Sequence, residues 1–330
     1  MRAFGDRDGL VKLYTLCFIL FAAFIAGPAW IPYKLYDPAT AAAHGLSDSL
    51  DYLALADNQF VANPVHRYRV VEPLIVRVFA RAHPQQGFFV LNLALTAAAA
   101  TCLLAMLLES VPLTVALLSS LVFLGSRDVI VATGTPMIDP SLYLLIAGCF
   151  LALKKQSRWA LALTLLLAPT IKENGLFLFP LIFLFGSLSS RECASYGALG
   201  ILVTLAVREA VDLHFGGAMS ENIAASIQHL RNVPGAMQEA VSLHGLGTLW
   251  MAFGPFWLIL AWGFRDWRKL DRQLLYWVPL VFVQILLAGP GGSSRMAILA
   301  FPVVACEVAF ILAPYLTPIP CSAAQSAPEA

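Results

Sequence analysis

Long apolar runs recur along almost the whole chain, and short stretches that carry charges, glycine or proline separate them. The runs lack the strict alternation of apolar and polar positions that a membrane β-barrel needs, and lipid leaves the backbone only helices or closed barrels. We therefore predict an all-α integral membrane protein with about ten transmembrane helices, in a range of about eight to twelve. The predicted spans lie near residues 11–30, 88–108, 112–125, 137–153, 159–169, 175–187, 194–212, 246–264, 273–289 and 296–313.

Three of these runs, near 112–125, 159–169 and 175–187, are shorter than the roughly 20 residues of a full crossing. Tilted, broken or partial crossings therefore stay open for them. We assign residues 1–313 to one polytopic domain. Residues 314–330, rich in proline, alanine and serine, are predicted to form a disordered cytoplasmic tail.

The composition narrows the class of protein further. The AVILMFWYC set makes up 59% of the chain, charged residues make up only 12%, and the mean hydropathy is +0.75. Soluble domains carry roughly 25% charged residues, so a soluble enzyme and low-complexity disorder are both excluded. A formal net charge of +1 gives no overall attraction to nucleic acid. The six cysteines follow neither a metal-ligand spacing nor a disulfide framework.

Basic residues in the short connections set the predicted orientation. Three connections carry them: Lys154, Lys155 and Arg158 in the first, Arg191 in the second, and Arg265, Arg268, Lys269 and Arg272 in the third. The positive-inside rule places all three in the cytoplasm. Alternation of the spans then predicts a multi-pass protein of the plasma (inner) membrane with both termini in the cytoplasm. A cleavable signal peptide that ends near 26–29 is the alternative for the first run.

This orientation leaves two long external loops, 31–87 and 213–245, and three short ones near 126–136, 170–174 and 290–295. In the second long loop, apolar residues recur at helical spacing. That pattern predicts short interfacial helices on the membrane surface, with Pro234 as a break.

The first external loop carries two acids, Asp48 and Asp51, three residues apart. That spacing puts both carboxylates on one side of a helical turn, and Tyr52 with the apolar residues after it would seat the turn on the membrane. A carboxylate in a partly desolvated cleft has a raised pKa and accepts a proton more readily than one in water, which suits a general base. The alternative is structural, with Ser47 or Asp48 as a helix N-cap.

Basic residues follow in the same loop at His66, Arg67 and Arg69. Guanidinium groups match phosphate oxygens in bidentate fashion, so these side chains are a candidate anion site. An ordinary anchor for lipid headgroups is the alternative interpretation.

The other external loops add further charged residues, namely Arg127 and Asp128, Asp139, Lys172 and Glu173, and Arg295. Capping a helix is the plain alternative for Asp139, and snorkelling is the alternative for Arg295. Lys172 and Glu173 could pair with each other or with water. Independent anchors would scatter between the two faces, whereas these charges converge on one face, so we predict a shared outward-facing cavity.

The residues in these loops resemble the GT-C superfamily of polytopic glycosyltransferases, in particular bacterial mannosyltransferase-like members that use polyprenyl- or dolichyl-phosphate sugars. The resemblance covers roughly residues 45–305. It rests on four places: Asp48 followed by Tyr52-Leu-Ala-Leu-Ala and a Tyr-Arg stretch, Asp139-Pro140, the Lys172-Glu173 loop, and Arg295 before Phe301-Pro302.

This resemblance implies an enzyme that moves a sugar, with inversion, from a polyprenyl-phosphate-linked donor to an acceptor hydroxyl on the external or periplasmic face. The acceptor would be a lipid, a glycan or a protein of the cell envelope. Asp48 would be the general base, with Asp51 as the fallback. The donor's lipid phosphate would be bound by His66, Arg67, Arg69, Lys172 and Arg295, and the cavity would be lined by Tyr52, Arg127, Asp128, Asp139 and Glu173.

Other classes stay open beside this expectation. A transporter or flippase of lipid-linked sugars would also need a polar cavity with cations, together with charged or broken helices near mid-membrane. A catalytically inactive accessory subunit would keep the same fold. A membrane acyltransferase would require a nucleophile on a defined motif, and no Gly-x-Ser-x-Gly sequence occurs. No ligand spacing demands a metal cofactor, although the outer carboxylates leave a divalent cation open.

Overall fold

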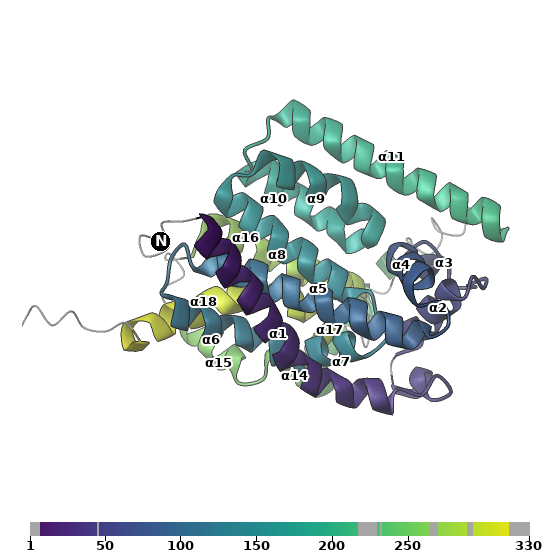
Figure 1. The fold of residues 1–330 in the computed structure, drawn as a ribbon, viewed down its shortest axis with the longest axis horizontal. Helices are drawn as coiled ribbons and strands as arrows, with labels where there is room; N and C mark the ends of the chain where they lie inside the picture. Colours follow the sequence, from purple (N-terminus) through teal and green to yellow (C-terminus); the bar gives the residue numbers. More distant parts are fainter. Residues whose placement is uncertain are drawn as a thin grey trace, which may run out of the picture.

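The computed structural model describes residues 7–44, 46–216, 230–231, 233–263, 270–288 and 293–316. These residues form helices joined by turns and short connections, and no strand occurs among them (Figure 1). The prediction of an all-α fold is confirmed.

The N-terminal third consists of two long helices with a group of short helices between them. α1 (Arg7–Leu35) runs diagonally across the front of the bundle in Figure 1. The chain then forms η1 (Ala41–His44), α2 (Ser47–Ala56), α3 (Pro64–Arg67), α4 (Val71–Ala80) and the long α5 (Pro84–Leu107). α2, α3 and α4 lie together at one end of the bundle, on the right of Figure 1, so the first predicted external loop is largely helical.

The rest of the chain adds helices of very different lengths. The middle part contains α6 (Leu113–Leu124), α7 (Arg127–Gly134), α8 (Asp139–Lys155), α9 (Arg158–Ile171), η2 (Glu173–Phe177), α10 (Leu178–Phe185) and α11 (Ser190–Phe215). The C-terminal part contains α13 (Val233–Ala240), α14 (Leu243–Phe253), α15 (Phe256–Gly263), α16 (Arg272–Ala288), α17 (Ser293–Ala297), η4 (Ile298–Ala300) and α18 (Phe301–Leu316).

Within the described residues, three helices are long and apolar enough to cross a membrane, and they cover Asp8–Leu35, Pro84–Leu107 and Arg295–Leu316. α6 and α7 pass the same test only as a pair, bent by 65°, which would make a fourth span. These helices support the prediction that the chain is a membrane protein. The prediction of about ten spans is not confirmed.

The shortfall has a structural reason, because many of the predicted spans are short helices. α8 has 17 residues, α9 has 14 and α16 has 17. At 1.5 Å per residue a 14-residue helix covers about 21 Å, which is less than the roughly 30 Å of a bilayer core. The predicted span 246–264 is divided between α14 and α15 by Gly254, whose φ of +54° lies in the left-handed region that favours glycine.

The second predicted external loop falls partly outside the described residues, at 217–229 and 232. In the described part, α11 continues to Phe215 and α13 begins at Val233. Pro234 therefore stands in the first turn of α13, where proline is tolerated, and residues 230–231 are helical as well. The predicted tail overlaps the end of α18, and residues 317–330 lie outside the described part.

α5 and α8 pack against each other at the centre of the bundle, and α1 packs on α5. A buried amide on α5, that of Asn92, fixes the connection between α7 and α8. It donates hydrogen bonds to the carbonyl oxygens of Ala132, Thr135 and Met137 at 3.2, 3.0 and 2.9 Å. Because this connection is held on α5, the position at which Asp139 begins α8 is held as well.

Charged residues collect at both ends of α8. At its C-terminal end, Lys154 donates to Asp271 at 2.7 Å and Lys155 pairs with Glu109. Asp139 stands at its N-terminal end, roughly 24 Å away at 1.5 Å per residue. The bundle therefore has a lysine-rich end and, opposite it, a second polar end.

Candidate functional site

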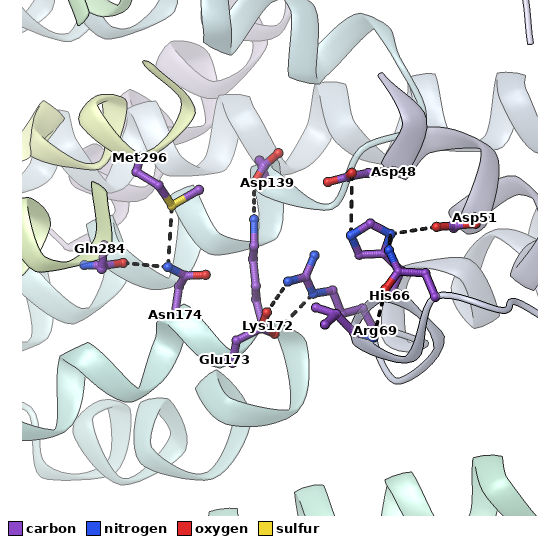
Figure 2. A network of polar contacts seen from close by, with 12 residues as sticks. Asp48, Asp51, His66, Arg69, Asp139, Lys172, Glu173, Asn174, Gln284 and Met296 are labelled. Carbon is purple, nitrogen blue, oxygen red and sulfur yellow. Dashed lines mark hydrogen bonds and ion pairs between the residues drawn. The ribbon is translucent and has the colours of Figure 1, made fainter. Parts of the chain in front are cut away.

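At the N-terminal end of α8, polar side chains from distant parts of the sequence form a contiguous group, which we call the polar cluster (Figure 2). They come from α2, the α3–α4 segment, the start of α8, the junction of α9 with η2, and α17. The members are Asp48, Asp51, Tyr52, His66, Arg69, Asp139, Lys172, Glu173 and Arg295.

Arg295 joins two carboxylates at the centre of the polar cluster. One terminal nitrogen donates to Asp48 Oδ2 at 2.9 Å, and the other donates to Asp139 Oδ2 at 2.7 Å. The second oxygen of Asp139 accepts from Lys172 Nζ, and both of these side chains are buried. Three segments that are far apart in the sequence are thereby tied together, and the guanidinium of Arg295 does not reach out as a snorkelling cation would.

The capping interpretations of the two acids are wrong. Leu46 is the N-cap of α2 and Ile138 is the N-cap of α8, and neither helix has a side-chain cap. Asp48 and Asp139 stand instead in the first turns of these helices and bind cations. Negative charge there also interacts favourably with the helix dipole.

His66 lies between the two acids of α2. Its Nδ1 is 2.7 Å from Asp51 Oδ2, and its Nε2 is 3.5 Å from Asp48 Oδ1. As the three-residue spacing predicts, both carboxylates face the same side, where they flank one imidazole ring (Figure 2). Asn63 Nδ2 also lies 3.1 Å from Nδ1.

Arg69 forms the other branch of the polar cluster. Its Nε donates to Glu173 Oε2 at 3.1 Å, a second nitrogen pairs with the other oxygen of the same carboxylate, and a third donates to Tyr52 Oη at 2.9 Å. Lys172 and Glu173 therefore do not pair with each other, because Lys172 binds Asp139 and Glu173 binds Arg69. The bidentate geometry is the arrangement in which arginine binds carboxylates and phosphates most strongly.

The pKa of Asp48 differs from the one predicted from the sequence. Burial alone would raise the pKa of this carboxyl group, but the cation of Arg295 lowers it, and the protonated form of His66 lowers it further in acid. The net result is a pKa below the ordinary value, so the expectation of a raised pKa is wrong. The pKa of His66 is also lowered, mainly because burial disfavours the charged imidazolium, so the ring is neutral at pH 7.

The charges around Lys172 and Glu173 follow the same physics. Burial lowers the pKa of Lys172, and the adjacent carboxylate of Asp139 opposes that effect. Burial would raise the pKa of Glu173, but Arg69 outweighs it and brings the pKa to about 2. Glu173 is therefore charged at neutral pH, and both side chains are held by a partner of opposite sign.

Arg67 lies outside the polar cluster, although the sequence grouped it with Arg69. Its side chain is 2% exposed, its Nε donates to the carbonyl of Val61 at 2.8 Å, and its guanidinium packs over the ring of Phe60 at 4.5 Å. One of its nitrogens is 3.8 Å from Asp212. This geometry fits a structural role and does not favour binding of a phosphate.

Arg127 and Asp128 open α7, where Arg127 is exposed and Asp128 is buried. No hydrogen bond or ion pair joins Arg127 to the polar cluster within the part of the chain that the structure describes. Its predicted role in lining the cavity is thus without support from the geometry.

Two acids of this region were not singled out as site residues from the sequence. Asp212 on α11 accepts from Tyr68 Oη, which lies 2.7 and 2.9 Å from its two carboxylate oxygens, and this contact holds the first predicted external loop against α11. Glu72 on α4 is 2% exposed, and neither carboxylate oxygen has a hydrogen bond of ordinary geometry among the described residues. Burial raises the pKa of Glu72 to about 8. An acid inside the apolar stretch Val70–Val76 is the signal that could have revealed it.

An apolar recess of about 630 Å³ lies between α4 and α5, and none of its lining residues belongs to the polar cluster. Its walls include Ile75, Phe79, Val90 and Ala94, and Arg81 and His83 stand in the turn that joins the two helices. No acidic residue lines it. Its chemistry suits a lipid chain.

Among the described residues, no group of three or more histidine, cysteine and acidic side chains is placed to hold a metal ion. Comparison of the chain with protein families, curated proteins and solved structures finds no match. The chemistry of the polar cluster therefore rests on its own geometry.

Proposed function

We propose that this protein is a membrane glycosyltransferase of GT-C type, which moves a sugar from a polyprenyl-phosphate-linked donor to an acceptor hydroxyl on the external face. The observation that carries the proposal is that Arg295 joins Asp48 to Asp139, and that Asp139 also binds Lys172, so an acid and two cations from three separate connections lie in one group. A base beside fixed cations is what the transfer of a sugar from a lipid phosphate requires.

The reaction can be written with these side chains in defined roles. The acceptor oxygen attacks the anomeric carbon while the bond from that carbon to the phosphate oxygen breaks, so the configuration inverts. The phosphate leaves with the electron pair of the broken bond, and Lys172 and Arg295 stabilise its growing negative charge. Asp48 takes the proton of the acceptor hydroxyl.

The low pKa of Asp48 gives donor binding a second role in this scheme. Arg295 holds Asp48 and Asp139 at once. A lipid phosphate that draws Arg295 toward itself weakens the pair with Asp48, and the pKa of Asp48 then rises. The carboxylate becomes a stronger base only when the leaving group is in place, which limits wasteful proton uptake in the empty site.

The surroundings of the polar cluster are compatible with a lipid donor. The recess between α4 and α5 has apolar walls that suit a polyprenyl chain. Its first lining residue, Ile75, lies on α4 three residues after Glu72. The lysine-rich end of α8 lies opposite. By the positive-inside rule that end is cytoplasmic, so the polar cluster faces outward.

One observation favours a second candidate, a catalytically inactive accessory subunit. Within the polar cluster three cations, Arg69, Lys172 and Arg295, face four carboxylates, and every cation is already paired. A phosphate has to displace a carboxylate in order to bind. A closed set of ion pairs of this kind could also serve only to fix the fold.

Transfer by the purified protein in liposomes tests the proposal. The wild type is expected to convert a polyprenyl-phosphate sugar and an acceptor into product, detected by mass spectrometry, and Asp48→Asn is expected to abolish product formation. Asp271→Asn at the lysine-rich end is the matched control and should transfer sugar normally. In cells, the null and Asp48→Asn strains should both accumulate the lipid-linked sugar.

The alternatives give different results in the same assays. A flippase moves a fluorescent lipid-linked sugar across the liposome membrane without forming product. An inactive subunit gives neither product nor movement, and Asp48→Asn then leaves the cellular glycans unchanged.

A further inference from the structure

The hydrogen bonds of His66 fix which of its ring nitrogens carries the proton. Asp51 is a carboxylate and can only accept, so the contact of 2.7 Å between Asp51 Oδ2 and His66 Nδ1 requires a hydrogen on Nδ1. Asn63 Nδ2 can only donate and competes for the same nitrogen at 3.1 Å, but the shorter, charge-assisted contact is the stronger one. In the neutral ring, Nε2 is then the acceptor.

With this tautomer, no hydrogen lies between Asp48 and the facing nitrogen of His66. Asp48 Oδ1 and His66 Nε2 are 3.5 Å apart, and both are acceptors in the resting state. No hydrogen bond can form between them until a proton arrives. A proton taken from the acceptor hydroxyl by Asp48 supplies it.

We propose that His66 receives, on Nε2, the proton that Asp48 removes from the acceptor hydroxyl, and that Asp51 is a positioning residue that holds the imidazole in the required tautomer. The inference rests on the proposed glycosyltransferase function and assigns His66 to proton transfer instead of phosphate binding.

The proton balance of the transfer is complete with these groups. The acceptor O–H bond breaks as the new glycosidic bond forms, and the phosphate keeps the electrons of the bond it loses. The proton moves from Asp48 to His66, which gives an imidazolium between two carboxylates. The proton on Nε2 then leaves to water on the side of Asp48, whose side chain is 19% exposed against 12% for His66, and the ring returns to its Nδ1–H tautomer.

The groups that face His66 explain why the imidazole can accept a proton and release it again. Asp48 and Asp51 stabilise the imidazolium, whereas burial and the cation of Arg69 oppose it. The ring of Tyr52 packs 5.6 Å from the imidazole and keeps it in place. An ordinary imidazole has a pKa of about 6.5 against about 3.9 for an aspartate, so a proton on Asp48 moves to His66 downhill.

Kinetics of the liposome-reconstituted protein test this relay. His66→Gln can still hydrogen-bond Asp51 but cannot carry a proton, and we expect kcat to fall roughly 100-fold or more with KM for the lipid donor little changed. In the wild type, activity should fall as acid protonates His66. Asp51→Asn should move this acid limb to lower pH, because the imidazolium loses a neighbouring negative charge, and His66→Gln should remove it.

His244→Gln makes the same change at an exposed histidine and is the matched control. Thermal unfolding of each variant shows whether it is folded. The relay is overturned if His66→Gln keeps kcat and its pH profile, or if it raises only KM for the donor, since the latter is the signature of a phosphate ligand.

A measurement that needs no activity separates the relay from the proposed function. In the ¹⁵N NMR spectrum of histidine-labelled protein, the signal lost in His66→Gln should show a neutral ring at pH 7 with its proton on Nδ1. A proton on Nε2 overturns the relay whatever the enzyme does. A wild type with the expected tautomer that transfers no sugar overturns the proposed function, and the relay with it.

Discussion

Replacing Lys172 by methionine tests whether the polar cluster is the buried, interlocked unit that the structure describes. The side chains of Lys172 and Asp139 are each 3% exposed, and Lys172 Nζ binds Asp139 Oδ1. Lys172→Met removes the charge and keeps most of the volume. Asp139 is left with Arg295 as its single cation.

The expected loss of stability follows from the burial. Removing one partner of a buried ion pair costs about 3–5 kcal/mol, because the remaining charge stays out of water. Asp139 keeps one strong partner at 2.7 Å, so we expect the lower end of this range, about 3 kcal/mol. Lys154→Met makes the same change at the other end of α8, where the pair with Asp271 is 26% and 46% exposed, and should cost at most about 1 kcal/mol.

Equilibrium unfolding in detergent, followed by tryptophan fluorescence and circular dichroism, measures both losses. If Lys172→Met costs no more than Lys154→Met, the pair with Asp139 is not desolvated and the argument for the polar cluster as one unit fails. If the double variant Lys172→Met and Asp139→Asn shows no coupling beyond the sum of the single changes, the same conclusion follows.

Three further predictions concern the surroundings of the polar cluster. Asn92→Ala removes the amide that donates to three carbonyl oxygens at the α7–α8 junction and should cost about 2–4 kcal/mol in the same unfolding assay. Glu72 has a raised pKa of about 8 in the folded protein, so its contribution to stability is complete below about pH 4.5 and is lost as the pH rises toward 8, by roughly 1.4 kcal/mol per pH unit. Glu72→Gln should flatten this dependence, and an unchanged pH profile would contradict the assignment. Ala94→Trp fills the recess between α4 and α5 and should raise KM for the lipid donor, whereas Ala23→Trp on the exposed face of α1 should not.

The helical class could be predicted from the sequence because lipid restricts the backbone so strongly. The number of spans could not, because hydropathy does not record where a helix stops. Gly254 illustrates the difference, since its apolar surroundings read as one run while its left-handed φ divides that run into two short helices.

Part of the candidate site was also accessible from the sequence. Charged side chains in very short connections of an apolar chain are costly, so Asp139, Lys172 and Arg295 stood out. Their pairing could not be predicted, and the direction of the pKa of Asp48 was wrong for that reason, because the cation that lowers it is 247 residues away. Arg67 and Arg69 are two residues apart and look alike in sequence, yet one is bound to backbone carbonyls and the other to Glu173.

In the proposed reaction, the two sides of the polar cluster have different roles: the Arg295 side binds the phosphate and the His66 side accepts the proton. On the Arg295 side, the cations bind Asp48 and Asp139 and keep both acids charged. A phosphate can therefore bind there only by displacing a carboxylate from its cation. On the His66 side, the neutral imidazole faces Asp48 with no proton between them. Phosphate binding at Arg295 and proton transfer to His66 therefore act on the same carboxylate in succession, so a variant that weakens donor binding should also shift the pH dependence of kcat, whereas independent sites would leave it unchanged.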